Sequence, residues 1–64
     1  MRLDRKKIQL KMAILCMNQQ QLADKSGVSR QTISAVMNGR SCRPELLGKI
    51  ARALEVEPSE IIEN

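Results

Sequence analysis

Residues 19–38 read QQQLADKSGVSRQTISAVMN, a pattern that predicts a short helix, a tight turn and a second helix. Gly27 can adopt the positive backbone dihedral that redirects the chain within three residues. Ala23 is small, which suits a point where the two helices cross at close range. Ile33 and Val36 would anchor the second helix in a core, so its other face is expected to be polar and to point outward.

The helices expected in this chain each begin at a residue that suits a helix start. Asp4 can accept a hydrogen bond from the free amides of a first helix. Asn18 and Gln21 form a variant of the capping box for the second helix. Ser29 caps the third helix, and Pro44 suits the first turn of the fourth because its missing amide would be unpaired there.

The fold class predicted from these signals is all-α. Apolar spacings of three and four recur, and no segment alternates strictly between apolar and polar residues. Pro58 opens a fifth helix of a single turn. A chain of 64 residues buries only about 60% of the surface that it exposes when unfolded, which is enough for one small core. We therefore expect one compact five-helix domain over residues 1–64, with the helix-turn-helix segment at about residues 19–38.

The composition argues against catalysis. Phe, Tyr and Trp are absent, so the core must be aliphatic, and His is absent too. Without His the chain lacks the commonest general base and metal ligand. Two cysteines alone cannot complete a four-ligand zinc site from nitrogen and sulfur donors. We expect neither an enzyme nor a metal site, and no cofactor.

The two cysteines are expected to be free thiols in a cytoplasmic protein. No signal-peptide pattern follows Met1, and no apolar run approaches the roughly 20 residues of a membrane span. Cys16 lies among apolar neighbours and is predicted to belong to the core. Cys42 lies between Ser41 and Arg43 and is predicted to lie in a loop.

Charge is distributed unevenly along the chain. Residues 1–43 carry nine Lys and Arg against two Asp, a balance of +7, whereas residues 44–64 have a balance of −3. This asymmetry indicates a basic face for a polyanion and a separate acidic end. Charge alone favours the simpler explanation, a solvated surface without a partner.

The motifs together resemble the Cro and repressor-type (XRE-like) helix-turn-helix domains of phage and bacterial regulators. The resemblance rests on QQQLA (19–23), GVS (27–29), TIS (32–34) and NGR (38–40), and more weakly on KIARAL (49–54) and the apolar pair at 61–62. It implies a lambda-repressor-like domain that binds operator DNA as a homodimer, with repression by occlusion of polymerase. It also implies a bacterial or phage origin.

The resemblance assigns base contacts to the beginning of the second helix of the motif. Arg30 suits the two acceptors of guanine, and Gln31 suits the acceptor and donor of adenine, each pair worth about 1–3 kcal/mol of discrimination. Ser34 would contact a base or a phosphate, and Ala35 is small enough to meet a thymine methyl group. A helix with such a polar face fits the major groove of B-DNA, which is about 12 Å wide.

Two further groups of residues follow from the same resemblance. Contacts with DNA phosphates, which position a protein without reading sequence, are expected from Asn18, Gln19, Gln20, Asn38, Arg40, Ser41 and Arg43. The apolar dimer interface is expected to consist of Leu54, Val56, Ile61 and Ile62.

The chain departs from the family in two places. Met12 and Met37 stand where many members have a partly buried Arg–Glu pair, and we expect an apolar contact between them instead. Leu10 and Ile14 stand where relatives are usually polar. They are either scattered surface residues or a patch for a partner protein or a second subunit.

The second possibility defines the alternative function, an antitoxin-type or adaptor module with this fold. Its binding to a partner protein would not depend on Arg30 and Gln31. If Gln31 and Ser34 are simply solvated polar residues, the DNA-reading hypothesis fails. Binding to single-stranded nucleic acid is disfavoured, because it usually depends on aromatic side chains for stacking.

Overall fold

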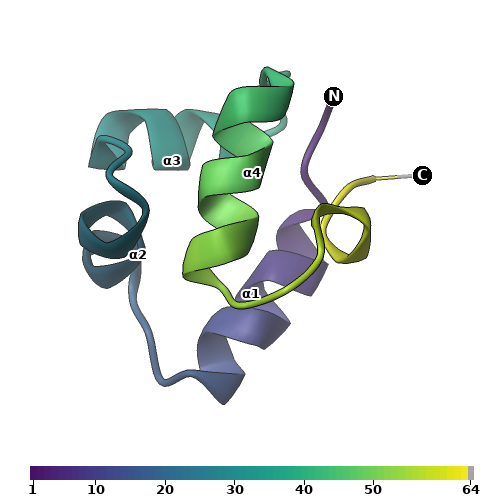
Figure 1. The fold of residues 1–64 in the computed structure, drawn as a ribbon. Helices are drawn as coiled ribbons and strands as arrows, with labels where there is room; N and C mark the ends of the chain where they lie inside the picture. Colours follow the sequence, from purple (N-terminus) through teal and green to yellow (C-terminus); the bar gives the residue numbers. More distant parts are fainter. Residues whose placement is uncertain (64) are drawn as a thin grey trace.

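The computed structural model describes residues 1–63. Its elements are α1 (Arg5–Ile14), α2 (Gln19–Ser26), α3 (Arg30–Met37), α4 (Pro44–Ala53) and the 3-10 turn η1 (Pro58–Glu60). Helix α4 lies in the middle of the domain. Helices α2 and α3 lie on one side of it, and the N-terminal segment and η1 lie on the other (Figure 1). The all-α fold class is therefore confirmed for the described residues.

Local signals place the helix starts where the sequence predicts them. Asp4 and Ser29 each accept a hydrogen bond at 3.2 Å from the backbone amide three residues further on. Asn18 and Gln21 form the reciprocal capping box, with bonds of 2.8 and 2.9 Å. Pro44 occupies the first turn of α4. Each of these features depends on residues at most three positions apart.

The predicted count of five α-helices is too high by one. Pro58 opens only three residues of 3-10 helix, which is capped by Ile61, and Ile62 then pairs with the N-terminal segment. Leu3 and Ile62 form an isolated antiparallel bridge, in which the Asp4 amide donates to the Ile61 carbonyl at 2.7 Å. Pairing of the C-terminal segment with residues 1–4 requires extended backbone, which ends the helical turn.

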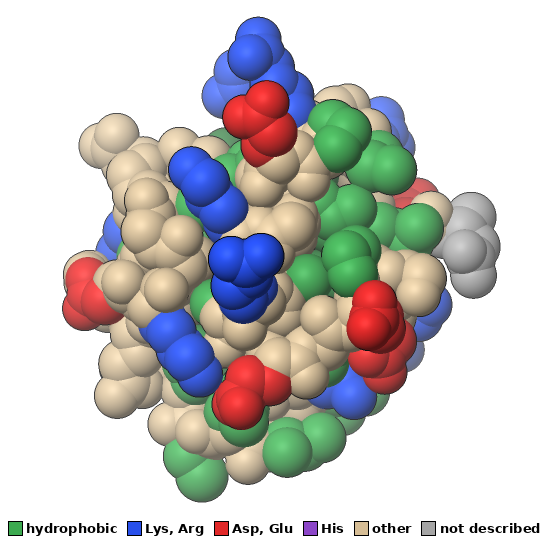
Figure 2. Space-filling view, in the orientation of Figure 1, with side chains coloured by type: hydrophobic (Ala, Val, Ile, Leu, Met, Phe, Trp, Pro, Cys, Tyr) green, Lys and Arg blue, Asp and Glu red, His purple; other side chains and the backbone are tan. Residues whose placement is uncertain are grey.

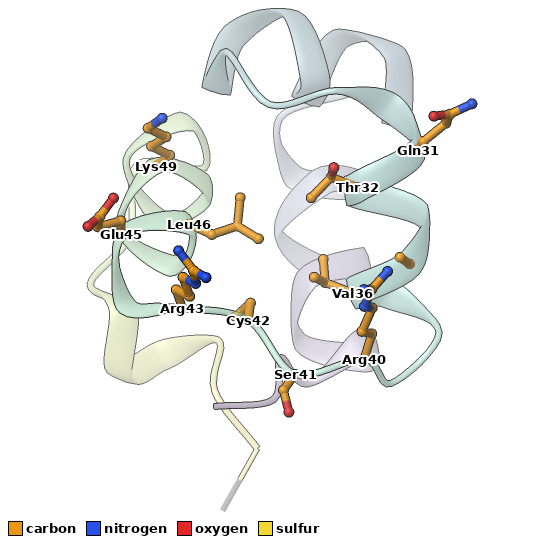
Figure 3. Close-up of a pocket in the computed structure, with 11 residues that line it drawn as sticks. Gln31, Thr32, Val36, Arg40, Ser41, Cys42, Arg43, Glu45, Leu46 and Lys49 are labelled. Carbon is orange, nitrogen blue, oxygen red and sulfur yellow. The ribbon is translucent and has the colours of Figure 1, made fainter.

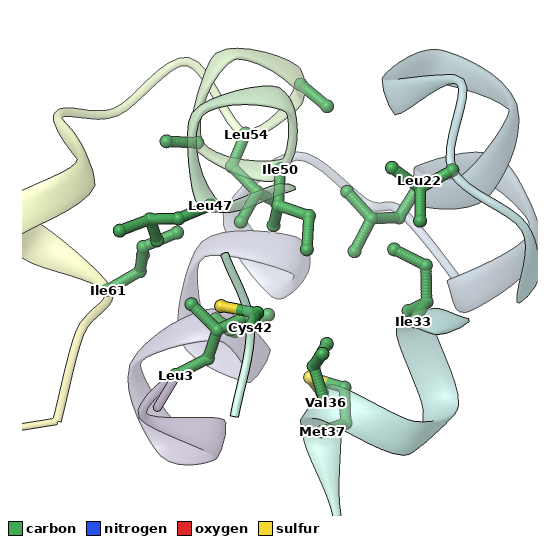
Figure 4. Close-up of a cluster of buried hydrophobic side chains, with 14 of the residues drawn as sticks. Leu3, Leu22, Ile33, Val36, Met37, Cys42, Leu47, Ile50, Leu54 and Ile61 are labelled. Atoms are coloured by element: carbon green, nitrogen blue, oxygen red, sulfur yellow. The ribbon is translucent and has the colours of Figure 1, made fainter. Parts of the chain in front are cut away.

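The core is aliphatic, as the composition predicts (Figure 4). Met12 and Met37 are both buried in the same cluster, a condition that the expected contact between them requires. Leu15, which caps the end of α1, is half-buried against this cluster. The largest fully buried side chains are those of Ile8, Leu22, Ile33, Ile50, Leu54 and Ile61.

Two members of the expected dimer interface belong to this core. Leu54 is 2% exposed and Ile61 is 0% exposed, so neither can meet a second copy without opening the domain. Their assignment to the interface is therefore corrected. The physical reason is that both side chains are packed in the cluster of buried apolar residues that forms the core. Val56 and Ile62 are half-buried and remain as predicted interface residues.

The cysteines are both free, but only one lies as predicted. Cys16 is exposed, because it forms the turn after α1 with a φ of 53°, and this turn directs the side chain away from the core. Cys42 lies in the loop between α3 and α4, where its side chain is buried. This burial raises the pKa of the Cys42 thiol above its ordinary value. Between residues 1 and 63, no helix is long and apolar enough to cross a membrane.

Candidate nucleic-acid interface

Helix α3 is divided between a buried and an exposed side. Ile33, Val36 and Met37 are buried, which holds the helix to the core along its inner side. Arg30 and Gln31 at its beginning are exposed. The two remaining predicted base contacts, Ser34 and Ala35, are half-buried one turn further on.

The turn between α2 and α3 sets the direction of α3. Gly27 has a φ of +74°, a left-handed conformation that an L side chain rarely adopts. Ala23 is 6% exposed and Leu22 is 0% exposed, and the helices α2 and α3 pack directly on each other. The small residue and the left-handed turn together allow the close crossing that the sequence predicts.

The beginning of α2 offers donors to an anion. The side-chain oxygen of Asn18 is occupied by the amide of Gln21, so the NH2 group of Asn18 is the part left to contact a phosphate. The amides of Gln19 and Gln20 lie in the first turn, where a helix supplies no partner for them. The side chain of Gln20 donates to Asp24 at 3.1 Å, which holds it along the helix.

The loop after α3 supplies the positive charge. Arg40, Ser41 and Arg43 are exposed, as is Asn38, which caps the end of α3. The loop closes one end of a groove of about 500 Å³ between α3 and α4 (Figure 3). The predicted contact residues Gln31, Ala35, Arg40, Ser41 and Arg43 all line this groove. Arg30, Ser34 and the beginning of α2 lie outside it.

Lys49 of α4 also lines the groove, and sequence analysis did not assign it a role. It follows Leu46 by three residues and Glu45 by four, which puts the three on neighbouring positions of α4. All three line the groove. This helical spacing was visible in the sequence, but it acquires meaning only once α3 is known to lie beside this face.

Within residues 1–63, the Lys and Arg side chains that line the groove form no ion pair, whereas two carboxylates near the C-terminal end do. The ion pairs found within residues 1–63 are Lys11–Glu60 at 3.7 Å and Lys25–Glu55 at 3.4 Å. Neither pair involves a residue of the groove. Figure 2 shows Lys and Arg side chains in a row across the face of the molecule that is turned to the viewer in Figure 1. Arg40, Arg43 and Lys49 line the groove against the single carboxylate of Glu45, so the groove has a positive balance suited to a phosphate backbone.

The polar and cationic side chains at this surface are suited to recognition of a polyanion. In the part of the chain that the structure describes, His, Cys, Asp and Glu form no group of three that could hold a metal ion. A short helix, a left-handed turn and a second helix with an exposed polar beginning define a helix-turn-helix protein. The cationic loop beside it fits the backbone of duplex DNA.

The chain belongs to the helix-turn-helix family of the Cro and repressor type, whose family model (Helix-turn-helix) matches residues 17–61. Membership of this family supports a role as a DNA-binding transcriptional regulator. No curated protein is significantly similar to it.

Two solved structures share the fold. One is the restriction-modification controller protein C.AhdI from Aeromonas hydrophila, which is 28% identical with a TM-score of 0.79 over 88% of this chain and 86% of the other. The second is described as PhpD with cadmium, complexed with hydroethylphosphonate, and is 26% identical with a TM-score of 0.84. The whole of this chain matches only 14% of the length of that protein.

Proposed function

We propose that this regulator is a repressor that binds operator DNA as a homodimer and blocks polymerase by occupying the site. The observation that carries the proposal is the division of α3: Arg30 and Gln31 are exposed, while Ile33 is 0% exposed. The helix is thereby held by its inner side, and its beginning is left to reach base edges in the major groove. The similar fold of a restriction-modification controller protein supports a regulatory role.

The proposed base contacts follow from the donors and acceptors on α3. Arg30 pairs with the two acceptors of guanine, and Gln31 pairs with the acceptor and donor of adenine. Ser34 and Ala35 are half-buried, which limits them to short-range contacts such as a hydroxyl bond or packing against a thymine methyl group. Arg30 and Gln31 therefore carry most of the sequence discrimination.

The proposed phosphate contacts come from two places that flank α3. At the beginning of α2, free amides and the helix dipole favour an anion. In the loop after α3, Arg40 and Arg43 supply full charges beside the hydroxyl of Ser41. The residues assigned to phosphates are Asn18, Gln19, Gln20, Asn38, Arg40, Ser41 and Arg43.

A homodimer follows from the small number of contacts that one copy can make. Two copies on half-sites about 34 Å apart would present two α3 helices on the same side of the duplex. Val56 and Ile62 are the half-buried apolar residues that the proposed interface retains. The neighbouring acidic residues Glu55, Glu57 and Glu63 keep this end of the protein away from phosphates.

Selection from random duplex DNA, performed at two salt concentrations, tests the proposal. The unmodified chain is expected to enrich a roughly palindromic site. Arg30→Ala and Gln31→Ala should each relax the preference at a defined base pair in both half-sites, by about 1–3 kcal/mol. Arg5→Ala and Gln9→Ala, which remove the same side chains from exposed positions on α1, should leave the enriched site unchanged.

Binding that enriches no site and disappears with salt would contradict the proposal, because it would consist only of attraction to the phosphate backbone. Enrichment of a site without symmetry would retain sequence reading and reject the homodimer.

The second candidate function rests on α1. Leu10 is 61% exposed and Ile14 is 72% exposed, one turn apart on the same side of the helix. As a protein-interaction or antitoxin-type module, the chain would bind a partner protein on this apolar pair. A complex that Leu10→Gln and Ile14→Gln abolish, and that Arg30→Ala leaves intact, would favour this function.

A further inference from the structure

The loop that carries the proposed phosphate contacts is held by the first residues of the chain. The amide of Cys42 donates to the carbonyl of Met1 at 2.6 Å, and the backbone nitrogen of Met1 donates to the carbonyl of Cys42 at 3.3 Å. These two bonds join positions 41 residues apart. We call residues 1–4 the N-terminal strap.

The strap is fixed at its other edge by the C-terminal segment. The amide of Asp4 donates to the carbonyl of Ile61 at 2.7 Å, and the amide of Glu63 donates to the carbonyl of Arg2 at 2.9 Å. Leu3 is 3% exposed and belongs to the core, so it anchors the strap between its two neighbours. The strap is therefore fixed to the core, and its hydrogen bonds to Cys42 fix the loop beside it.

The loop has little support of its own. The last backbone bonds that it receives from α3 end at Gly39 and Arg40, which donate to the carbonyls of Val36 and Ala35 at 3.2 Å. For residues 41–43, the described backbone bonds from outside α4 are those with Met1. Removing the strap would leave the backbone of this segment hydrogen-bonded only at its ends, with the Cys42 side chain as its remaining contact with the core.

The strap also determines which side chains of the loop face outward. Cys42 is 8% exposed, whereas its neighbours Ser41 and Arg43 are exposed. Arg43 has extended backbone, with a φ of −79° and a ψ of 156°, and in such backbone successive side chains point to opposite sides. Holding the Cys42 backbone against Met1 keeps its side chain inward beside Leu3 (Figure 4) and so directs Ser41 and Arg43 outward.

We propose that the N-terminal strap is a positioning element for DNA binding, which holds the loop at residues 41–43 so that Ser41 and Arg43 meet a phosphate. This inference rests on the proposed function. The strap itself touches no DNA in this proposal. Its contribution is to order the loop before the duplex arrives, and a loop that must be ordered during binding weakens the complex.

The first test needs no DNA and measures the reactivity of the buried Cys42 thiol. In a Cys16→Ser background, a disulfide reagent such as dithiobis(nitrobenzoate) reports Cys42 alone. Leu3→Ala, and a chain that begins at Asp4, should react at least severalfold faster than the unmodified chain, because the loop opens to solvent. Circular dichroism would establish the temperature at which every variant is folded.

Leu15→Ala is the matched control, because it removes the same side chain from a half-buried position at the end of α1. Its thiol reactivity should stay at the level of the unmodified chain. Equal reactivity in the strap variants and the unmodified chain would overturn the proposal, whatever the DNA measurements show.

The second test measures binding to the selected duplex over a range of salt concentrations. The strap variants should bind roughly 5- to 30-fold more weakly, which corresponds to ordering about one residue of backbone. The dependence on salt should become shallower because a phosphate contact is lost, while the preferred bases stay the same.

A loosened loop with unchanged affinity would overturn the positioning role. Loss of base preference together with affinity would also overturn it, because the strap would then act on α3 rather than on the loop. If the unmodified chain binds no duplex, the proposed function and the positioning role both fail. The thiol measurement would still decide whether the strap holds the loop.

Discussion

Helices α1 and α3 are built alike on their inner sides and differ on their outer sides. Each buries apolar residues in the same core, with Ile8 and Ile33 both 0% exposed. On the outside, α3 presents Arg30 and Gln31, whereas α1 presents Leu10 and Ile14. The inner sides determine stability, and the outer sides determine the class of partner. Duplex DNA fits the first surface, and an apolar protein surface fits the second.

The inner side of α3 should dominate the stability of the whole domain. Ile33→Ala is expected to lower the free energy of unfolding by about 2–5 kcal/mol, because it leaves a cavity in a fully buried position. Urea denaturation followed by circular dichroism measures this change. The matched variant Ile14→Ala, at 72% exposure, should change the value by less than about 0.5 kcal/mol. Equal effects of the two variants would show that the inner and outer sides of these helices do not differ in their contribution to stability as described.

Substitution in the turn between α2 and α3 should have the next largest effect on the folding free energy. Gly27→Ala is expected to cost about 1–2 kcal/mol of folding free energy, because Gly27 has a φ of +74°. A Cβ at this position would meet nothing within 4 Å, so the cost is backbone strain without a steric clash. Gly48→Ala on α4, where the surroundings are equally open, is the control and should be neutral or stabilising. Equal costs for the two variants would contradict the strained turn.

The positive charge of the groove beside α3 should contribute to the salt dependence of DNA binding. Arg43→Ala should reduce the slope of log K against log salt concentration by about 0.9, the loss of one phosphate contact. Arg52→Ala removes the same side chain from an exposed position of α4 outside the groove, and the slope should stay unchanged. Titrations of a fluorescent duplex at four salt concentrations measure both. Identical slopes for Arg43→Ala and the unmodified chain would remove this residue from the interface.

The outer side of α1 should have the smallest effect on DNA binding. The double variant Leu10→Gln and Ile14→Gln is expected to alter the affinity for the selected duplex less than twofold, because neither residue lies at the groove. Its folding free energy should change by less than about 0.5 kcal/mol at these exposed positions. Loss of DNA affinity in this variant would indicate that α1 contributes to a dimer that DNA binding requires.

Local signals suffice to predict a structural feature that depends on a few neighbouring residues. The caps at Asp4, Asn18 and Ser29 and the left-handed turn at Gly27 were all predicted, because each depends on residues within one helical turn. The division of α3 was also predicted, because helical periodicity assigns its residues to two sides. The proposed contact residues on α3 follow from the family resemblance, and their contacts with DNA stay a prediction; Arg30 and Gln31 are exposed, whereas Ser34 and Ala35 are half-buried.

The errors lie where one segment covers another. The apolar pattern predicts Leu54 and Ile61 at a surface, but both are buried in the core cluster. Cys16 was assigned to the core, but the turn after α1 exposes it. Lys49 received no role because its neighbour across the groove belongs to α3, which is distant in the chain.

The sequence by itself determined the helices, the turn between α2 and α3 and the polar beginning of α3, because backbone propensity, capping and periodicity act over a few residues. Only the tertiary structure decided which apolar residues remain accessible. It alone brought Met1 against Cys42, two positions 41 residues apart. Burial and long-range hydrogen bonds depend on how distant segments pack, and no local pattern encodes the strap that holds the loop.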